Sequence, residues 1–354
     1  MRKGFTSRRL LCGMIADARN VLVVHKSTRY EYDRSQYSAT LSEIEFENAL
    51  RSRGSNYAEI RRRHEAHRQT LGEIIDFFDC RRLNTRIRQQ HNYRGDDVRW
   101  ADVVVSAGGD GTMLLTAAKI PNKRKPLIGI NTDPQRSQGQ LCMVRKEGVN
   151  VQDDLTAVFE DRFRWKLRQR IRVDVTDIGA SIGRNKQPFV LALNEVFLGE
   201  SDPSQTSYLE VVINGGDRRK QKSSGMVVCT GSGSTAWAYN IGRVTDSQVQ
   251  KVLEAAGVQN LSSQFVQEVC EKHNRSLVYD PSEMRMAFAV RDCIAKGIFG
   301  LKEPYGIAER IQVRSRCKDA RLVVDAGWSC PFNDGASATL EMNEKDALLT
   351  VELI

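Results

Sequence analysis

Long apolar runs are missing from the 354-residue sequence. A membrane-spanning helix requires about 20 consecutive apolar residues, whereas the longest candidates here, such as Val21–Val24 and Val103–Val105, are only as long as strands. We therefore expect a soluble protein without a membrane partner. A secretory signal is also disfavoured, because the apolar stretch from Leu10 to Ile15 is short and interrupted.

Paired cysteine motifs are absent as well. The 8 cysteines are scattered along the chain, with no C-x-x-C pair and no histidine at zinc-finger spacing. This pattern favours reduced, mostly buried thiols, with a metal-binding or disulfide role as the alternative. The sequence also contains no internal repeat and no low-complexity tract.

The hydrophobic content of 40% is enough for two domains, and the chain is long for a single core. Strands that alternate with helices between Asn20 and Asn131 predict an open parallel, Rossmann-like sheet, in which ligands bind at the carboxyl ends of strands. After about Arg162, short apolar or alternating runs separated by Gly, Asn, Asp and Pro predict a β-rich part.

We therefore predict an α/β N-terminal domain over residues 20–161 and a β-rich, β-sandwich-like C-terminal domain over residues 162–354. Two amphipathic stretches indicate a helical insertion at residues 247–273, and the C-terminal residues can pack back on the first domain. The segment RFRWKLRQRIR, residues 162–172, is interpreted as one half-buried strand with a basic outer face.

Basic residues exceed acidic ones and give a net charge of +9. The charge lies in several short clusters, which favours solvated faces or an anionic small substrate; no recognised motif supports a nucleic-acid partner. The first 16 residues carry Arg2, Lys3, Arg8 and Arg9 but no acid. That balance is typical of a mitochondrial transit peptide, which we place within residues 1–19, with a frayed basic terminus as the alternative.

The segment Gly108-Gly109-Asp110-Gly111-Thr112 has the features of a phosphate-binding loop. It follows a strand predicted over Val98–Ser106 and precedes a helix predicted over Met113–Ile120, so its amides and the helix N-terminus can converge on phosphate oxygens. A carboxylate beside such a loop is electrostatically costly unless it accepts a hydroxyl proton or holds a metal ion. The loop is neither a Walker A motif nor a Rossmann fingerprint, and a purely structural turn is the alternative.

Two further segments carry polar groups in apolar surroundings. TGSGSTAW, residues 230–237, alternates hydroxyls and glycines after an apolar strand, and such groups suit phosphate or ribose oxygens. Asn194-Glu195 places an amide and an acid inside an apolar run, where both need partners if they are buried. A common Ser/Gly-rich turn and a satisfied structural pair are the respective alternatives.

Together the three segments resemble the signature of the NAD kinase family, in which GGDGT, an Asn-Glu pair and a segment of the GSTAW type occur in this order. GGDGT alone is not specific, because diacylglycerol and sphingoid-lipid kinases share it, but the ordered trio is. Flanking segments resemble the mitochondrial branch of the family: STRYEYD, VRWADVVVSAGGDGTMLL, INTDPQRSQGQLC, RQRIRV, ALNEVFLGE, KQKSSG and VRSRC.

The resemblance implies ATP-dependent transfer of a phosphoryl group to the 2′-hydroxyl of the adenosine ribose of NAD, with Mg²⁺ or another divalent cation as cofactor. It also implies a homodimer in the mitochondrial matrix. Asp110 would be the general base, and no residue is assigned as a metal ligand. The other expected contacts are Gly108, Gly109, Gly111, Thr112, Ser232 and Gly233 to phosphates or nucleotide, and Asn194, Glu195, Ser234, Thr235, Ala236 and Trp237 to NAD.

Several positions depart from the commoner pattern of the family. Ser224-Gly225 stands where that pattern has Asp-Gly, Gly231 replaces a proline, Trp237 replaces a tyrosine, and residues 132–136 replace a Gly-rich stretch. Two rival functions remain: a lipid kinase, which would need a large apolar pocket that nothing between residues 194 and 237 suggests, and an inactive dinucleotide-binding regulator, which would not need Asp110.

Overall fold

The computed structural model describes residues 14–38, 40–134, 139–143, 150–176, 189–294, 304–325 and 327–354. Contacts divide the chain into a first unit, Met1–Lys166 with Leu348–Ile354, and a second unit, Leu167–Ala347. Within the described ranges, no helix is both long enough and apolar enough to cross a membrane. The described cysteines are free thiols and most are buried, which confirms that interpretation; Cys12 lies outside these ranges.

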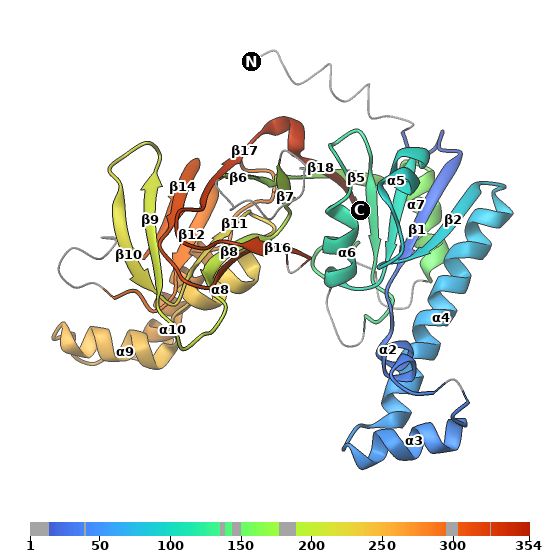
Figure 1. The fold of residues 1–354 in the computed structure, drawn as a ribbon, viewed down its shortest axis with the longest axis horizontal. Helices are drawn as coiled ribbons and strands as arrows, with labels where there is room; N and C mark the ends of the chain where they lie inside the picture. Colours follow the sequence, from blue (N-terminus) through green and yellow to red (C-terminus); the bar gives the residue numbers. More distant parts are fainter. Residues whose placement is uncertain are drawn as a thin grey trace. The chain divides into compact units, whose positions relative to one another are not determined.

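The first unit contains a six-stranded sheet with the order β2-β1-β3-β4-β18-β5 (Figure 1). The pairs β2–β1, β1–β3, β3–β4 and β4–β18 are all parallel, which confirms the predicted α/β architecture. The elements are β1 (Asn20–His25), α2 (Arg29–Ser35), α3 (Glu43–Ser52), α4 (Tyr57–Cys80), β2 (Asn84–Gln89), α5 (Gly95–Trp100), β3 (Val103–Ala107), α6 (Asp110–Ala117), β4 (Leu127–Ile130), α7 (Val151–Phe159), β5 (Phe163–Arg168) and β18 (Leu348–Leu353).

The core of this unit lies between the central strands and the helices α4 and α7. Alternate residues of β1, Val21 and Val23, are fully buried against apolar residues of α4 such as Ile74 and Phe78. Ile15 is also fully buried in this cluster, so the folded part of the unit includes residues that precede β1. Burial on both faces explains why the central strands are continuous apolar runs.

Two parts of the first unit differ from the sequence prediction. The predicted strand Val98–Ser106 begins too early, because Val98 and Trp100 belong to α5, where the Asp97 side chain caps the Arg94 amide. The strand itself begins at Val103. Sequence patterns also missed β2, since its residues NTRIRQ are polar and only partly buried at the edge of the sheet.

The second unit is a sandwich of two six-stranded sheets with the orders β10-β9-β14-β17-β6-β7 and β13-β12-β11-β8-β15-β16. One apolar cluster draws side chains from both sheets, which confirms the predicted β-sandwich-like part. The elements are β6 (Ile171–Thr176), β7 (Val190–Ala192), β8 (Glu195–Glu200), β9 (Ser207–Ile213), β10 (Arg219–Ser223), β11 (Met226–Cys229), η1 (Gly233–Thr235), α8 (Trp237–Gly242), α9 (Asp246–Ala255), α10 (Ser263–Ser276), β12 (Met286–Val290), β13 (Tyr305–Ala308), β14 (Arg310–Ser315), β15 (Ala320–Val324), β16 (Trp328–Pro331), β17 (Ser337–Met342) and η2 (Glu344–Asp346).

The helices α9 and α10 lie side by side at one end of this unit, as Figure 1 shows. The side chains of Thr245 and Ser262 cap their N-termini by accepting backbone amides. Val249 and Val266 form a small apolar cluster between the two helices. The amphipathic pattern of residues 247–273 therefore produces a helical pair, as predicted.

The interpretation of residues 162–172 as one strand is wrong. The segment forms two strands, β5 and β6, which belong to different sheets and are separated by Gln169 and Arg170. Arg170 is fully buried, and its Nε atom donates to the Asp346 carbonyl oxygen at 2.5 Å. Burial lowers the pKa of Arg170 to about 10, so the guanidinium remains charged at neutral pH. The alternating pattern predicted that all of these basic residues are exposed, but Arg170 is a buried cation.

The Asp346 carboxylate binds the neighbouring Arg172 through two hydrogen bonds. Oδ2 accepts from Nε at 2.7 Å and Oδ1 from Nη2 at 2.6 Å. Such a bidentate, largely buried pair ties η2 to β6 near the point where the chain leaves the second unit.

Replacing Asp346 by Asn should destabilise the second unit, because the amide offers one acceptor where the carboxylate offers two. We expect a loss of about 2 kcal/mol, seen as a melting temperature lower by roughly 4 to 8 °C in calorimetry. The matched control is Asp334→Asn, which removes the exposed Arg316–Asp334 pair and should change the melting temperature little. Equal losses in the two variants would contradict this account.

Candidate active site

The loop Gly108–Thr112 connects β3 to α6 at the carboxyl edge of the first sheet. Gly109 is the N-cap of α6 and Asp110 is its first residue. The amides of Asp110 and Gly111 therefore belong to the first turn, where no preceding carbonyl of the helix can accept them. Gly111 is exposed, and a Cβ atom at Gly109 or Gly111 would meet no atom within 4 Å. The loop is thus open toward solvent and suited to bind an anion.

The carboxylate of Asp110 is held in place by the segment that follows β4. Oδ1 accepts the Leu141 amide at 2.9 Å, and Oδ2 accepts the Gln140 amide at 3.1 Å. The preceding Gly139 has a φ of +62°, and a Cβ atom there would lie 2.7 Å from Nδ2 of Asn131. Glycine is therefore required at position 139. The amides that follow it orient the Asp110 carboxylate.

Thr112 has a different environment from the rest of the loop. It is buried, its hydroxyl donates to Oε1 of Gln90 at 3.2 Å, and its amide donates to the Gly109 carbonyl oxygen. A Cβ atom at Gly108 would lie only 2.3 Å from the Thr112 hydroxyl oxygen. The absence of a side chain at Gly108 therefore leaves room for the Thr112 side chain to pack against the loop backbone.

The segment after β4, which replaces a Gly-rich stretch, contacts α4. The Thr132 amide donates to the Gly108 carbonyl oxygen, and its hydroxyl lies 3.0 Å from Nδ1 of His67. Burial lowers the pKa of His67 to about 3, so its ring is neutral. Asp133 forms an ion pair with Arg63 at 2.8 Å. The remainder of this segment, residues 135–138, lies outside the described residues.

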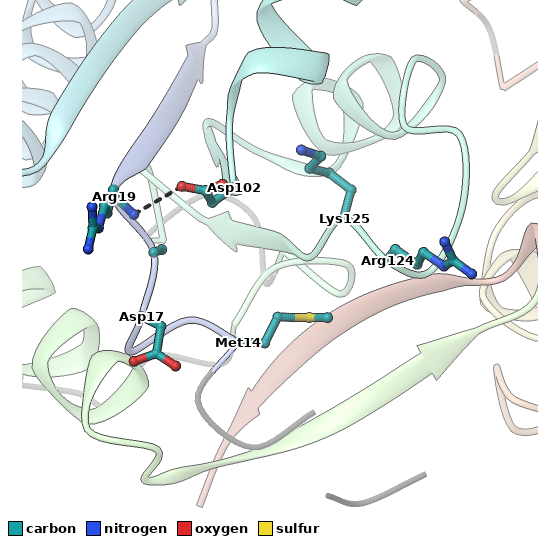
Figure 2. A pocket seen from close by; sticks show the side chains of 7 residues that line it. Met14, Asp17, Arg19, Asp102, Arg124 and Lys125 are labelled. Atoms are coloured by element: carbon teal, nitrogen blue, oxygen red, sulfur yellow. Dashed lines mark hydrogen bonds between the residues drawn. The ribbon is translucent and has the colours of Figure 1, made fainter. Parts of the chain in front are cut away.

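A cavity of about 410 Å³ is found at the opposite edge of the first unit (Figure 2). Its lining includes Arg19, Asp102 and Lys125, which directly precede or lie close to the starts of β1, β3 and β4. The Asp102 carboxylate accepts the amides of Arg19 and Asn20 at 3.0 and 2.9 Å. Since ligands of open parallel sheets bind at the carboxyl ends of strands, this cavity is not part of the candidate site.

Asn194 and Glu195 lie at the turn between β7 and β8 in the second unit. The apolar run that contains this pair in the sequence therefore forms two strands, separated by Leu193 and Asn194. Oδ1 of Asn194 and Oε2 of Glu195 are buried, and neither accepts a hydrogen bond within the described ranges. Buried polar atoms without partners are costly, so a ligand that supplies donors fits here better than a satisfied structural pair.

The electrostatics of Glu195 differ from those of an exposed acid. Burial, and to a lesser extent the charge of Asp325, raise its pKa to about 7. In the register of the sheet Glu195 lies opposite Cys229 of β11. The carboxylate therefore changes its protonation state close to neutral pH.

The segment Thr230–Trp237 follows β11 and packs directly against the Asn194 turn. The Thr230 hydroxyl donates to the Leu193 carbonyl oxygen at 2.5 Å, and its amide donates to that of Asn194 at 2.9 Å. A Cβ atom at Gly233 would lie 2.2 Å from the Asn194 carbonyl oxygen, so the two segments touch where only glycine fits. At Gly231 a Cβ atom would lie 2.3 Å from the Asp280 carbonyl oxygen, which gives the departure from proline a steric reason.

The predicted ligand contacts in this segment fall into two groups. Ser232, Gly233 and Ser234 are buried; the Ser232 hydroxyl accepts from Nη1 of Arg168 at 3.0 Å, and that of Ser234 donates to the Gly231 carbonyl oxygen at 2.7 Å. Thr235 and Trp237 are exposed, and Ala236 is partly exposed. The second group is accessible to a ligand, whereas the first supports the turn.

Trp237 begins α8 and is part of an aromatic stack. Its ring lies on Phe197 with centroids 5.0 Å apart and an interplanar angle of 23°. The Arg291 guanidinium carbon lies 5.5 Å from the Trp237 ring centroid. The exposed indole thus has a defined orientation from which a planar group could be bound.

Sequence reasoning missed two residues of the second unit. Arg168 supports Ser232, and the carboxylate of Asp325, directly after β15, accepts amides of the Asn194 turn. The only sequence signal for Asp325 is an acid at the end of the apolar run ARLVV. For Arg168 the alternating basic pattern predicted an exposed side chain, whereas the residue is buried.

Comparison with known proteins gives the family. No protein-family model matches the chain. The chain is 38% identical to "NAD kinase 2, mitochondrial" of Homo sapiens, over 97% of this chain and 87% of that protein.

Two solved structures share the fold with a TM-score of 0.55. An NAD kinase from Archaeoglobus fulgidus, determined in complex with ATP, is 18% identical and matches 94% of this chain and 92% of its own. A yeast NADH kinase complexed with NADH is 15% identical and matches 95% of this chain and 84% of its own. Identity to the human relative over nearly the full length, together with the three motifs and their geometry, leads to one conclusion: the chain belongs to the NAD kinase family.

Proposed function

We propose that the chain is an NAD kinase that phosphorylates the 2′-hydroxyl of the adenosine ribose of NAD with ATP and yields NADP and ADP. The observation that carries this proposal is the Gly108–Thr112 loop, in which the carboxylate of Asp110 is held by two amides beside an open helix N-terminus. Family membership over nearly the whole chain supports it. The structures that share the fold contain ATP in one case and NADH in the other, which supports a nucleotide donor and a nicotinamide dinucleotide acceptor.

In the proposed reaction the 2′-oxygen attacks the γ-phosphorus of ATP, ADP leaves, and the hydroxyl proton passes to Asp110. Each oxygen of Asp110 accepts one amide in the structure, which orients the carboxylate and leaves a further lone pair for the proton. The amides of Asp110 and Gly111 at the start of α6 would stabilise phosphate oxygens. Positioning and charge neutralisation then supply most of the rate acceleration.

The dinucleotide contacts that we propose involve the Asn194 turn. Oδ1 of Asn194 and Oε2 of Glu195 are buried acceptors, and ribose hydroxyls or an amide group of NAD are donors of matching type. Thr235, Ala236 and Trp237 are the accessible residues of the neighbouring segment, and we propose that they contact a base or amide edge. We propose that Ser232, Gly233 and Ser234 act by shaping the turn.

A divalent cation, Mg²⁺ in the first instance, is part of the proposal. Among the residues that the structure describes, no group of three acidic, histidine or cysteine side chains could hold a metal ion. That donor set fits an ion held mainly by the phosphates of ATP rather than by protein side chains. When bound, the ion neutralises charge on the phosphates.

We also propose where the chain is located and how it assembles. The human relative is named mitochondrial, and the basic first residues agree with import into the matrix. Because Ile15 and Ala18 are buried in the core of the first unit, we propose that the transit segment ends before Met14. A homodimer follows the family resemblance, and light scattering of the purified chain would measure it.

Replacing Asp110 by Asn should lower kcat for NADP formation roughly 100- to 10,000-fold, because the amide cannot accept the hydroxyl proton. The assay incubates the purified chain with NAD, ATP and Mg²⁺ and detects NADP with an NADP-specific dehydrogenase, while circular dichroism checks the fold. The matched control is Asp102→Asn: this carboxylate also accepts two amides, but at the amino edge of the sheet, and the control should retain activity.

Normal turnover by the Asp110 variant would refute its role as base. A folded wild-type chain that forms no NADP would refute the kinase proposal; NAD binding without turnover would then favour a regulator, and phosphorylation of diacylglycerol would favour a lipid kinase.

The pH dependence of kcat/KM for NAD should report the Glu195 carboxylate. Because burial raises its pKa to about 7, the charged acceptor is present above that pH and is lost as the pH falls through it. We therefore expect kcat/KM for NAD to decline below about pH 7, and Glu195→Gln to remove this acid limb. A profile that is flat, or identical in the two proteins, would contradict the assignment.

A tagged chain that lacks residues 1–13 should stay outside mitochondria, whereas the full-length chain should be imported. Cell fractionation with the same tag on both chains provides the comparison. Unchanged import of the shortened chain would refute the transit segment. The truncation preserves Ile15 and hence the core.

A further inference from the structure

Asp325 is the first residue after β15 and lies outside the three sequence motifs. Its carboxylate accepts the backbone amides of the turn between β7 and β8. Oδ2 accepts from Leu193 at 2.5 Å, and Oδ1 accepts from Asn194 at 2.8 Å and from Glu195 at 3.0 Å. In return the Asp325 amide donates to the Glu195 carbonyl oxygen at 3.1 Å. One side chain therefore satisfies every amide of this turn.

The backbone conformation at Asp325 restricts which residue types can occupy this position. Its φ is +50°, a left-handed conformation that Asp and Asn tolerate better than other residues with side chains. Only 7% of the residue is exposed. A side chain without an acceptor would leave three amides unsatisfied in the interior, which costs free energy for each.

The charge of Asp325 is balanced inside the second unit. Burial raises its pKa to about 6, while the three amides and the charge of Arg170 act in the opposite direction. The carboxylate is therefore mainly ionised at neutral pH. Arg170 itself is fixed by the Asp346 carbonyl oxygen, so two opposite and buried charges lie near each other in the second unit.

The same turn is held from its other side by Thr230. The Thr230 hydroxyl donates to the Leu193 carbonyl oxygen, and its amide donates to that of Asn194. The turn is thus clamped between Asp325 and Thr230. Its side-chain oxygens, Oδ1 of Asn194 and Oε2 of Glu195, are buried and accept no hydrogen bond within the described ranges.

We propose that Asp325 is a positioning residue for the dinucleotide: it fixes the backbone of Leu193, Asn194 and Glu195 so that the two unpartnered oxygens are aimed at NAD. The inference rests on the proposed function. Asp325 does not touch the substrate, and it acts through the turn. A purely structural role is the competing account, and it would affect stability without selecting one substrate.

The test is Asp325→Asn, which keeps the size and the left-handed backbone but replaces one acceptor by an NH₂ group facing the Leu193 amide. We expect KM for NAD to rise roughly 10- to 100-fold, with KM for ATP within about twofold, because the distorted turn is a NAD contact only. Asp346→Asn is the matched control, since Asp346 also lies beside Arg170 but binds Arg172 instead of the turn. It should lower the melting temperature and leave both KM values unchanged.

The pH dependence of kcat/KM for NAD gives a second measurement, which should not change if Asp325 has a purely structural role. The titratable groups that face Glu195 are Asp325 and, on the neighbouring strand β11, Cys229. Removing the negative charge of Asp325 lowers the pKa of Glu195 toward its ordinary value. The acid limb of kcat/KM for NAD should therefore move to lower pH in Asp325→Asn, and no such shift should occur in Asp346→Asn.

Thr230→Val keeps the proposal testable if the Asp325 variant does not fold. It loosens the same turn without removing a charge, so it should raise KM for NAD and leave the acid limb in place. The proposal is overturned if Asp325→Asn only melts earlier, if Asp346→Asn raises KM for NAD equally, or if Thr230→Val leaves that KM unchanged. A wild-type chain that forms no NADP refutes the proposed function instead, and that result is distinct from all of these.

Discussion

Backbone amides that converge on an aspartate carboxylate hold each of the two candidate loops in shape. In the first unit the Asp110 carboxylate accepts the amides of Gln140 and Leu141. In the second unit Asp325 accepts those of the turn between β7 and β8. Buried amides need acceptors, and an ionised carboxylate is among the strongest that a protein has. Irregular backbone at strand ends can then keep one geometry, which a binding site requires.

The hydrogen bonds that fix the backbone also determine which polar atoms remain available to a ligand. In the second unit, Thr230 and Asp325 use the backbone groups of the Asn194 turn, while the side-chain oxygens of Asn194 and Glu195 have no partner within the described ranges. The burial cost of these oxygens is tolerable in a binding site because a substrate supplies the missing donors. Burial also brings the pKa of Glu195 to about 7, so the same packing that shapes the turn makes its charge sensitive to pH.

The fold was predictable wherever strands are buried on both faces. The apolar runs Val21–Val24 and Val103–Val105 lie within β1 and β3, because continuous apolar residues identify strands that are buried on both faces. The polar edge strand β2 gave no such signal. The alternation in residues 162–172 was misinterpreted because Arg170, a residue normally found at the surface, is buried beside acidic groups that come from distant parts of the chain.

The sequence by itself determined the family and the chemistry, because the order GGDGT, Asn-Glu and GSTAW and the aspartate in the first motif are properties of residue type and spacing. Only the tertiary structure decided how these residues are used. It showed that the hydroxyls of Ser232 and Ser234 are engaged within the turn while Thr235 is exposed, and it brought Asp325 to Glu195 across a separation of 130 residues. The reason is physical: hydrogen-bond partners across a sheet depend on strand order and register, which local sequence patterns do not encode.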